Sequence, residues 1–334
     1  MRDFQARQYI YLLKAFAIFS VVCAHTAVEP QNGSQVDHVI IYILNSIGTM
    51  GVPIFFIISG YLYFGNERTV KDFWRRKCRT VVIPWFFCES IVWLYVVLRK
   101  GGITFTAWLK YILGINNTTY YLTVLILFYA LFWRLKAYKA VLIGSIILSG
   151  ISLLGLGWGN SLAAQWNRLT ITPYLNIFNW MAYFALGMLL KKKECLEALA
   201  VFSKKILPIS VPLLVMDLCA HYYYSFPWTY FSKYAILNIT LQVLVVMGIC
   251  YLLSMKRMKN LAVVGEYSYT IYLLHGLGAG GVVWITARIG SNILILARPV
   301  IVILLVLFGI WIVKKICERL KFVKDVPKVL IGLR

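Results

Sequence analysis

The chain has 334 residues, of which 61% are hydrophobic and only 14% are charged, and its formal net charge is +22. Soluble domains usually carry about a quarter charged residues, so this composition argues against a soluble protein and indicates an integral membrane protein. The basic residues lie in short clusters between apolar runs, as expected of cytosolic flanks, and this distribution argues against a nucleic-acid partner.

The first apolar run, residues 13–25 (LKAFAIFSVVCAH), predicts a retained membrane helix, because its start is too polar for a cleaved signal peptide. Further apolar runs follow, and those at residues 81–98 and 300–313 can each reach the roughly 20 residues needed to cross a bilayer. The pattern predicts an all-α fold, a polytopic bundle of about ten transmembrane helices. Their expected centres are Phe19, Phe56, Val92, Ile126, Ile147, Ala182, Leu214, Val243, Leu277 and Leu305.

Lysine and arginine cluster in alternate loops, which predicts the orientation of the bundle. The clusters lie before Thr80, around residues 134–139, 191–205 and 256–259, and from Lys314 onward. Both termini are therefore expected in the cytosol, with residues 314–334 forming a short basic cytosolic tail. The loop at residues 99–110 departs from this pattern, because it carries three bases on the expected outer side. We expect one integral membrane domain over residues 1–334, so any chemistry takes place in or beside the bundle.

Lys14 and His25 stand at the two ends of the first expected helix. Their eleven-residue spacing makes three helical turns with only about 20° left over, so they share one face and lie about 16 Å apart along the axis. Polar groups in a span normally face the bundle interior or a wet cavity. The spacing alone leaves a second interpretation open, in which Lys14 snorkels to the headgroups and His25 caps the outer end.

Four longer motifs follow in a fixed order. They are GVPIFFIISGYLYF at residues 51–64, FWRRKCRTVVIPWF at 73–86, YYLTVLILFYALF at 120–132 and GEYSYTIYLLHG at 265–276. Together with the spacing of Lys14 and His25, this set resembles the acyltransferase 3 family of integral membrane acyltransferases, over about residues 9–313. That family moves acyl groups, commonly acetyl, onto sugars and other acceptors of bacterial envelopes. The resemblance therefore implies a membrane acyltransferase in a bacterial plasma (inner) membrane.

The resemblance also assigns individual positions. Lys14 and His25 match the basic residue, ten intervening residues and histidine that open the family pattern. Many members have arginine where this chain has Lys14, and the planar fork of arginine binds phosphate or carboxylate differently from the point charge of lysine. The remaining matched positions are Arg75 and Arg76 with Arg79 one turn later, Tyr121 and Leu122, Ser268 and Tyr269, and Leu274 and His275.

The implied chemistry is acyl transfer from a thioester to a hydroxyl, which needs a base to remove the acceptor proton. A neutral imidazole, with a pKa near 6.5, suits this task, so His25 is the candidate base. Lys14 would steer the acyl-pantetheine arm or polarise the thioester carbonyl.

The implied donor is cytosolic acyl-coenzyme A, with acetyl as the expected acyl group. Arg75 and Arg79 share a face if their stretch is helical, and Arg76 lies within one turn of Arg79. Arginine binds phosphate through two parallel hydrogen bonds, so the cluster is a candidate coenzyme A docking site. The alternative is that these bases only enforce the topology.

Other polar positions leave several roles open. Glu89, in the middle of the third expected span, should have a partner, because an isolated buried carboxylate is costly. It would pair with Lys14 or orient a catalytic group. His275 is a second catalytic group, a hydrogen-bonded core histidine or an acceptor ligand. The candidate acceptor-binding residues, for which packing is the alternative, are Tyr61, Tyr121, Ser268 and Tyr269.

The leading hypothesis is transfer of an acyl group to a hydroxyl of an envelope or extracellular polysaccharide, or of its lipid-linked precursor. The main alternative is a transporter or flippase for such a glycan, although the chain shows no matching second half, which transporters often have. A membrane glycosyltransferase would need an outward-facing carboxylate, and Glu29 and Asp37 are the only acids in the expected outer loops. No metal is expected, because none of the seven cysteines shows CxxC spacing.

Overall fold

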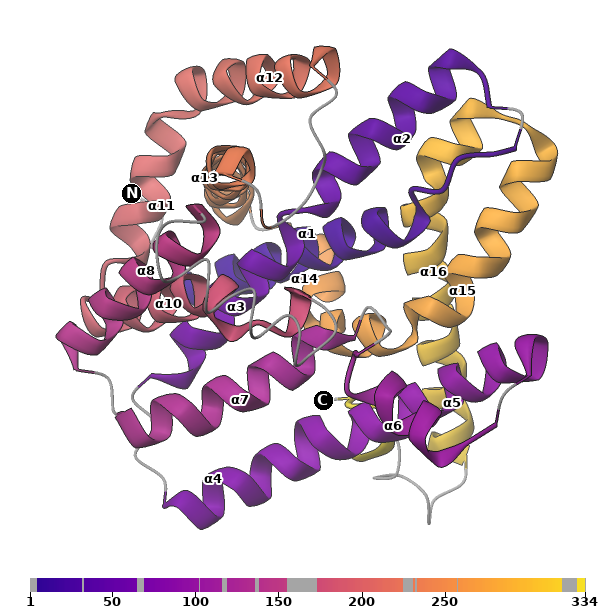
Figure 1. The fold of residues 1–334 in the computed structure, drawn as a ribbon, viewed down its shortest axis with the longest axis horizontal. Helices are drawn as coiled ribbons and strands as arrows, with labels where there is room; N and C mark the ends of the chain where they lie inside the picture. Colours follow the sequence, from indigo (N-terminus) through magenta and orange to yellow (C-terminus); the bar gives the residue numbers. More distant parts are fainter. Residues whose placement is uncertain are drawn as a thin grey trace. The chain divides into compact units, whose positions relative to one another are not determined.

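The protein is helical throughout the part of the chain that the computed structural model describes, with no strand among those residues, as the composition and periodicity predict (Figure 1). The described residues are 5–31, 33–64, 69–101, 103–115, 119–135, 138–154, 173–224, 231, 233–256, 258–319 and 329–333. Parts of the basic clusters, residues 136–137, 257 and 320–328, lie outside them. The helices belong to two compact units, each built from three separate stretches of chain.

Unit 1 contains Met1–Ala17, Thr49–Asn66 and Leu113–Gly265. Its elements are the first part of α1 (Ala6–Thr26), α3 (Gly51–Tyr63), α7 (Tyr120–Leu135), α8 (Lys139–Leu154), η2 (Pro173–Leu175), η3 (Ile177–Asn179), α10 (Met181–Lys192), α11 (Leu196–Lys205), α12 (Leu207–Tyr223), α13 (Lys233–Met255) and α14 (Lys259–Glu266). Helix α3 packs against α10, α10 against α8, and α13 against both α11 and α12.

The contact between α3 and α10 depends on two glycines. A methyl group at Gly60 would overlap the carbonyl oxygen of Phe184, and one at Gly187 would overlap the carbonyl oxygen of Ile57. Small residues at such a crossing let two membrane helices approach backbone to backbone. Aromatic rings fill the space beside this crossing, with Phe56 centred 5.4 Å from Phe128 and 5.5 Å from Trp180. The core of unit 1 is therefore aromatic and closely packed.

Unit 2 contains Ile18–Gly48, Glu67–Ile112 and Glu266–Arg334. Its elements are the end of α1, α2 (Gln35–Gly48), α4 (Val70–Lys77), η1 (Cys78–Val82), α5 (Ile83–Lys100), α6 (Phe105–Ile112), α15 (Ser268–Ile289) and α16 (Asn292–Arg319). Helix α16 packs against α15 and α2, and α5 packs against α15. Helix α15 ends at Gly290, whose φ of 68° is the left-handed conformation that glycine adopts readily at a helix C-terminus.

The segment from α4 to α5 runs as one continuous helical stretch with a π-helical turn at η1. Pro84 follows this turn and has no backbone N–H, and its ring would clash with the preceding helical turn of a regular α-helix. The wider π-helical turn relieves that clash. Within the turn, the carbonyl of Val81 accepts a hydrogen bond from the hydroxyl of Tyr269 at 2.7 Å.

Six stretches of the described chain are long and apolar enough to cross a membrane, so the protein is a multi-pass membrane protein. They are Ala6–Thr26, Gln35–Tyr63, Val70–Leu98, Ala235–Met255, Ser268–Ile289 and Asn292–Arg319. Helices α11 and α12, bent by 72°, make a seventh if they are counted as one span. All ten expected centres lie within helices, but α7, α8 and α10 are shorter than a full span, so the count of ten and the cytosolic termini stay predictions.

Candidate functional site

The end of α1 and the first half of α15, both in unit 2, bring two predicted site residues into contact. Helix α1 is unbroken from Ala6 to Thr26, as the spacing of Lys14 and His25 requires. His25 lies in its last turn and is partly exposed, and His275 on α15 is 6% exposed. The two imidazole rings are centred 4.8 Å apart, with their planes inclined at 41°. Two residues far apart in sequence thus form one pair, the His25–His275 pair.

The orientation of the His275 ring follows from its hydrogen bond. Its Nδ1 lies 2.6 Å from the carbonyl oxygen of Tyr272, one turn earlier on α15. A carbonyl oxygen only accepts hydrogen bonds, so Nδ1 carries the proton, and Nε2 is the basic nitrogen of the neutral ring. The ring is therefore held by the backbone of its own helix, while His25 approaches it from α1.

Glu89 lies on α5, the helix that packs against α15. Its side chain is only 2% exposed. The two helices meet where a methyl group added at Gly276 would lie 3.4 Å from Cγ1 of Val92, and Glu89 precedes Val92 by about one turn. The structure therefore places Glu89 and His275 on packed neighbouring helices. The alternative pairing of Glu89 with Lys14, which belongs to unit 1, stays a prediction.

Three other predicted residues lie in unit 1. The amine of Lys14 lies 5.7 Å from the ring centre of Tyr11, and the amine of Lys191 lies 5.3 Å from that of Tyr61. Tyr121 is buried; its hydroxyl lies 3.0 Å from Oγ of Ser59, within hydrogen-bond distance. These contacts are also compatible with packing, so the roles of Tyr61 and Tyr121 in acceptor binding stay predictions.

The arginine cluster of Arg75, Arg76 and Arg79 is helical, and its side chains are exposed. Arg75 and Arg76 lie on α4, Arg79 lies on η1, and all three side chains are exposed. The helical conformation is the condition on which the docking hypothesis depended. However, the π-helical turn shifts Arg79 from the regular α-helical register with Arg75.

The start of α15 contacts the helical stretch that carries this cluster. Ser268, the first residue of α15, is buried, and Tyr269 follows it. The Tyr269 hydroxyl donates its hydrogen bond to the carbonyl of Val81, two residues after Arg79. The carbonyl of Ile331, near the C-terminus, accepts a 3.0 Å hydrogen bond from Thr270. The structure therefore joins Tyr269 to the backbone of the helical stretch that carries the arginines, and Thr270 to the backbone of residue 331.

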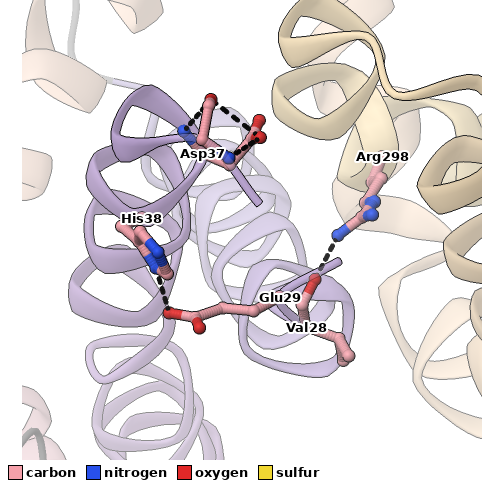
Figure 2. Close-up of polar contacts among 6 residues, drawn as sticks. Val28, Glu29, Asp37, His38 and Arg298 are labelled. Carbon is pink, nitrogen blue, oxygen red and sulfur yellow. Dashed lines mark hydrogen bonds and ion pairs between the residues drawn. The ribbon is translucent and has the colours of Figure 1, made fainter. Parts of the chain in front are cut away.

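The sequence-based interpretation missed Arg298 on α16. Its side chain is completely buried, and its Nη1 donates hydrogen bonds to the carbonyls of Thr26 and Val28, which follow His25. Figure 2 shows the bond to Val28. The available signal was a single arginine in the otherwise apolar stretch ILILARPVIVILLVL. A buried cation in a membrane helix usually has a functional or structural partner.

Glu29 and Asp37, the two acids expected in the outer loops, both have interaction partners. Oε1 of Glu29 lies 3.0 Å from Nδ1 of His38 (Figure 2). Oδ2 of Asp37 accepts hydrogen bonds from the amide and the hydroxyl of Ser34 at the start of α2 (Figure 2). Among the residues described, no group of three or more His, Cys, Asp or Glu side chains is arranged to hold a metal ion.

Comparison with known proteins identifies the family of this chain. A family model described as an acyltransferase domain, of the acyltransferase 3 type, matches residues 7–314. The succinoglycan biosynthesis protein ExoH of Rhizobium meliloti (strain 1021) is 29% identical over 103 residues, which cover 28% of this chain and 28% of that protein. No solved structure matches the chain. Because the family match covers nearly the whole chain, and confirms the resemblance seen in the motifs, the protein belongs to the acyltransferase 3 family of membrane acyltransferases.

Proposed function

We propose that the protein transfers an acyl group, with acetyl as the expected one, from cytosolic acyl-coenzyme A to a hydroxyl of a glycan. The acceptor is an envelope or extracellular polysaccharide or its lipid-linked precursor, and the enzyme acts in a bacterial plasma membrane. Family membership supports the reaction class. The local similarity to a protein named for succinoglycan biosynthesis supports a glycan acceptor.

The observation that carries the proposal is the contact of the His25–His275 pair. In the proposed step the acceptor hydroxyl gives its proton to the His25 imidazole while its oxygen bonds to the thioester carbonyl carbon. The carbon–sulfur bond then breaks, and coenzyme A leaves as a thiol after taking up that proton. Two positively charged rings at this separation would repel each other, so the pair is suited to hold one transferred proton at a time.

The other predicted residues take supporting roles in this proposal. The exposed cations Arg75, Arg76 and Arg79 bind the coenzyme A phosphates. Lys14 polarises the thioester carbonyl or steers the pantetheine arm, and Glu89 orients a catalytic group. The proposed acceptor-binding residues are Tyr61, Tyr121, Ser268 and Tyr269.

The direct test uses the purified full-length protein in lipid nanodiscs with acetyl-coenzyme A carrying a labelled acetyl group. We expect slow hydrolysis of the donor without an acceptor, and transfer of the label to glycan when an envelope polysaccharide fraction is added. His25→Ala serves as the inactive control. If neither hydrolysis nor transfer occurs with any of a broad set of acyl-coenzyme A donors, the enzymatic proposal fails and the flippase alternative is favoured.

A further inference from the structure

Arg298 lies in an environment that needs a specific explanation. It belongs to α16, one of the six candidate membrane spans, and its side chain is 0% exposed. Removing a guanidinium from water carries a large free-energy cost unless its donors are hydrogen-bonded. A cation kept at such a position therefore points to a role that an apolar residue would not fill.

The hydrogen bonds of Arg298 join three helices of unit 2. Nη1 donates to the carbonyl of Thr26 at 3.2 Å and to that of Val28 at 2.6 Å, and Nε donates to Oγ1 of Thr286 on α15 at 2.7 Å. Thr26 is the last residue of α1, where backbone carbonyls have no partner within the helix and the helix dipole favours a positive charge. Arg298 thus fastens the C-terminal end of α1 to α15 and α16.

The two helices that Arg298 joins are those that carry the histidine pair. His25 immediately precedes Thr26, whose carbonyl Arg298 binds. Thr286 follows His275 on α15 by eleven residues, or three turns, so both residues lie on the same face of that helix. Any movement of the end of α1 away from α15 would separate the two imidazole rings, and the Arg298 hydrogen bonds oppose that movement.

We propose that Arg298 is a positioning residue, which holds the last turn of α1 against α15 so that the imidazole of His25 stays in contact with that of His275. The importance of this contact for catalysis rests on the proposed function, whereas the positioning itself does not. Nη2 of Arg298 has no hydrogen-bond partner among the described residues, so a second role, binding an anionic acceptor through Nη2, has to be separated by experiment.

The first experiment measures position and requires no enzymatic activity. His25→Cys and His275→Cys are introduced into the full-length protein after its seven native cysteines have been replaced, and the rate of linkage by the shortest bifunctional methanethiosulfonate is followed. Arg298→Met should lower this rate severalfold, and Arg298→Lys less, because one ammonium cannot replace the fork of donors. Arg288→Met is the matched control, since Arg288 is exposed and lies 3.8 Å from the ring centre of Trp284. An unchanged rate in Arg298→Met would overturn the proposal, whatever reaction the protein catalyses.

Thr286 provides a milder variant if Arg298→Met does not fold. Thr286→Val removes the anchor on α15 but leaves both carbonyl contacts to α1, so linkage should slow by a smaller factor. Thr286→Ser keeps the hydroxyl and should restore the wild-type rate. Equal rates in the valine and serine variants would contradict the positioning role of Arg298.

The second experiment measures whether Arg298 acts through His25. Arg298→Lys should lower kcat by up to about a hundredfold, with the donor KM unchanged, because a displacement of about 1 Å can have such an effect. The KM for the polysaccharide acceptor should stay unchanged as well, because a positioning residue does not bind the acceptor. A raised acceptor KM with kcat unchanged would show that Arg298 acts as an anion-binding residue, and would overturn the positioning role.

Discussion

At the scale of single residues, the site depends on two imidazoles with different supports. The ring of His275 is hydrogen-bonded to the carbonyl of Tyr272 on its own helix, whereas His25 is presented by the end of a different helix. In the proposed reaction the acceptor hydroxyl gives its proton to His25, and this role suits His25 because it is the more exposed member of the pair.

His275→Ala should lower kcat for acyl transfer by roughly tenfold or more, because His25 loses the ring that borders it. His221→Ala is the matched control, since His221 is also a buried helical histidine and its Nδ1 lies 2.9 Å from the Asp217 carbonyl oxygen. Transfer is measured with labelled donor at equal amounts of folded protein. Equal losses in the two variants would mean that burial of a histidine, and not its position beside His25, explains the effect.

The double substitution Arg75→Ala with Arg79→Ala should raise the KM for acyl-coenzyme A and leave kcat nearly unchanged, because it removes cations that bind the donor phosphates. The control is Lys204→Ala with Lys205→Ala, which removes two other exposed bases that the topology prediction places in the cytosol. A rise in KM in both doubly substituted proteins would mean that the loss of any two exposed cations weakens donor binding, whichever site they occupy. If Arg75 and Arg79 affect only membrane insertion, the cluster serves topology and the docking role is contradicted.

The sequence predicts which positions share a face of one helix better than it predicts contacts between helices. Helical periodicity was sufficient to place Lys14 and His25 on one face of α1. The contact of His25 with His275 depends on how α1 packs against α15, and no local pattern encodes that packing. Arg298 was overlooked because its partners are backbone carbonyls, which carry no residue-specific signature.

At the scale of helices, close packing depends on positions where a side chain has no room. Gly60 and Gly187 let α3 and α10 approach until backbone atoms of one helix lie against the other. In contrast, a methyl group added at Gly144 on α8 would meet no atom within 4 Å. Replacement by alanine should therefore have opposite effects at Gly60 or Gly187 and at Gly144.

Gly187→Ala should destabilise the protein by at least about 1–3 kcal/mol, because the added methyl group overlaps the Ile57 carbonyl and forces the helices apart. Gly144→Ala should be neutral or slightly stabilising, since alanine has the higher helix propensity. Thermal unfolding in detergent, followed by tryptophan fluorescence, gives the comparison. Similar melting temperatures for both variants would contradict the close approach of α3 and α10.

The existence of the helices was predictable, whereas their lengths and irregularities were not. Every expected centre lies in a helix because each apolar run is bounded by polar residues. The π-helical turn before Pro84 and the 72° bend between α11 and α12 depend on tertiary packing and on local proline geometry. The shortness of α10, only 12 residues, was likewise not evident from hydrophobicity.

At the scale of the whole molecule, the chain builds two compact units from interleaved stretches. Helix α1 contributes its first part to unit 1 and its last part to unit 2. The sequence gives no sign of this division, because no linker or change in composition marks it. What the sequence does predict is orientation, through the alternation of basic and non-basic loops.

The predicted topology is tested with reporter fusions in a bacterial host. A green fluorescent protein joined to the C-terminus should fluoresce, because both termini are expected in the cytosol. Alkaline phosphatase inserted near Gly33, between α1 and α2, should be active because that loop is expected outside. The reverse pattern would place His25 on the cytosolic side and contradict an acceptor that arrives from outside.

The central claim is that His25 serves acyl transfer to a surface glycan, and mass spectrometry of cell-surface polysaccharide tests it most directly. Glycans are compared from cells that lack the gene and from cells that express the wild type, His25→Ala or His38→Ala. His38 is the matched control because it is an exposed histidine paired with Glu29. We expect ester-linked acyl groups with the wild type and with His38→Ala, and none in the other two strains. Acylation that is the same in all four strains, or retained in His25→Ala, would contradict the account.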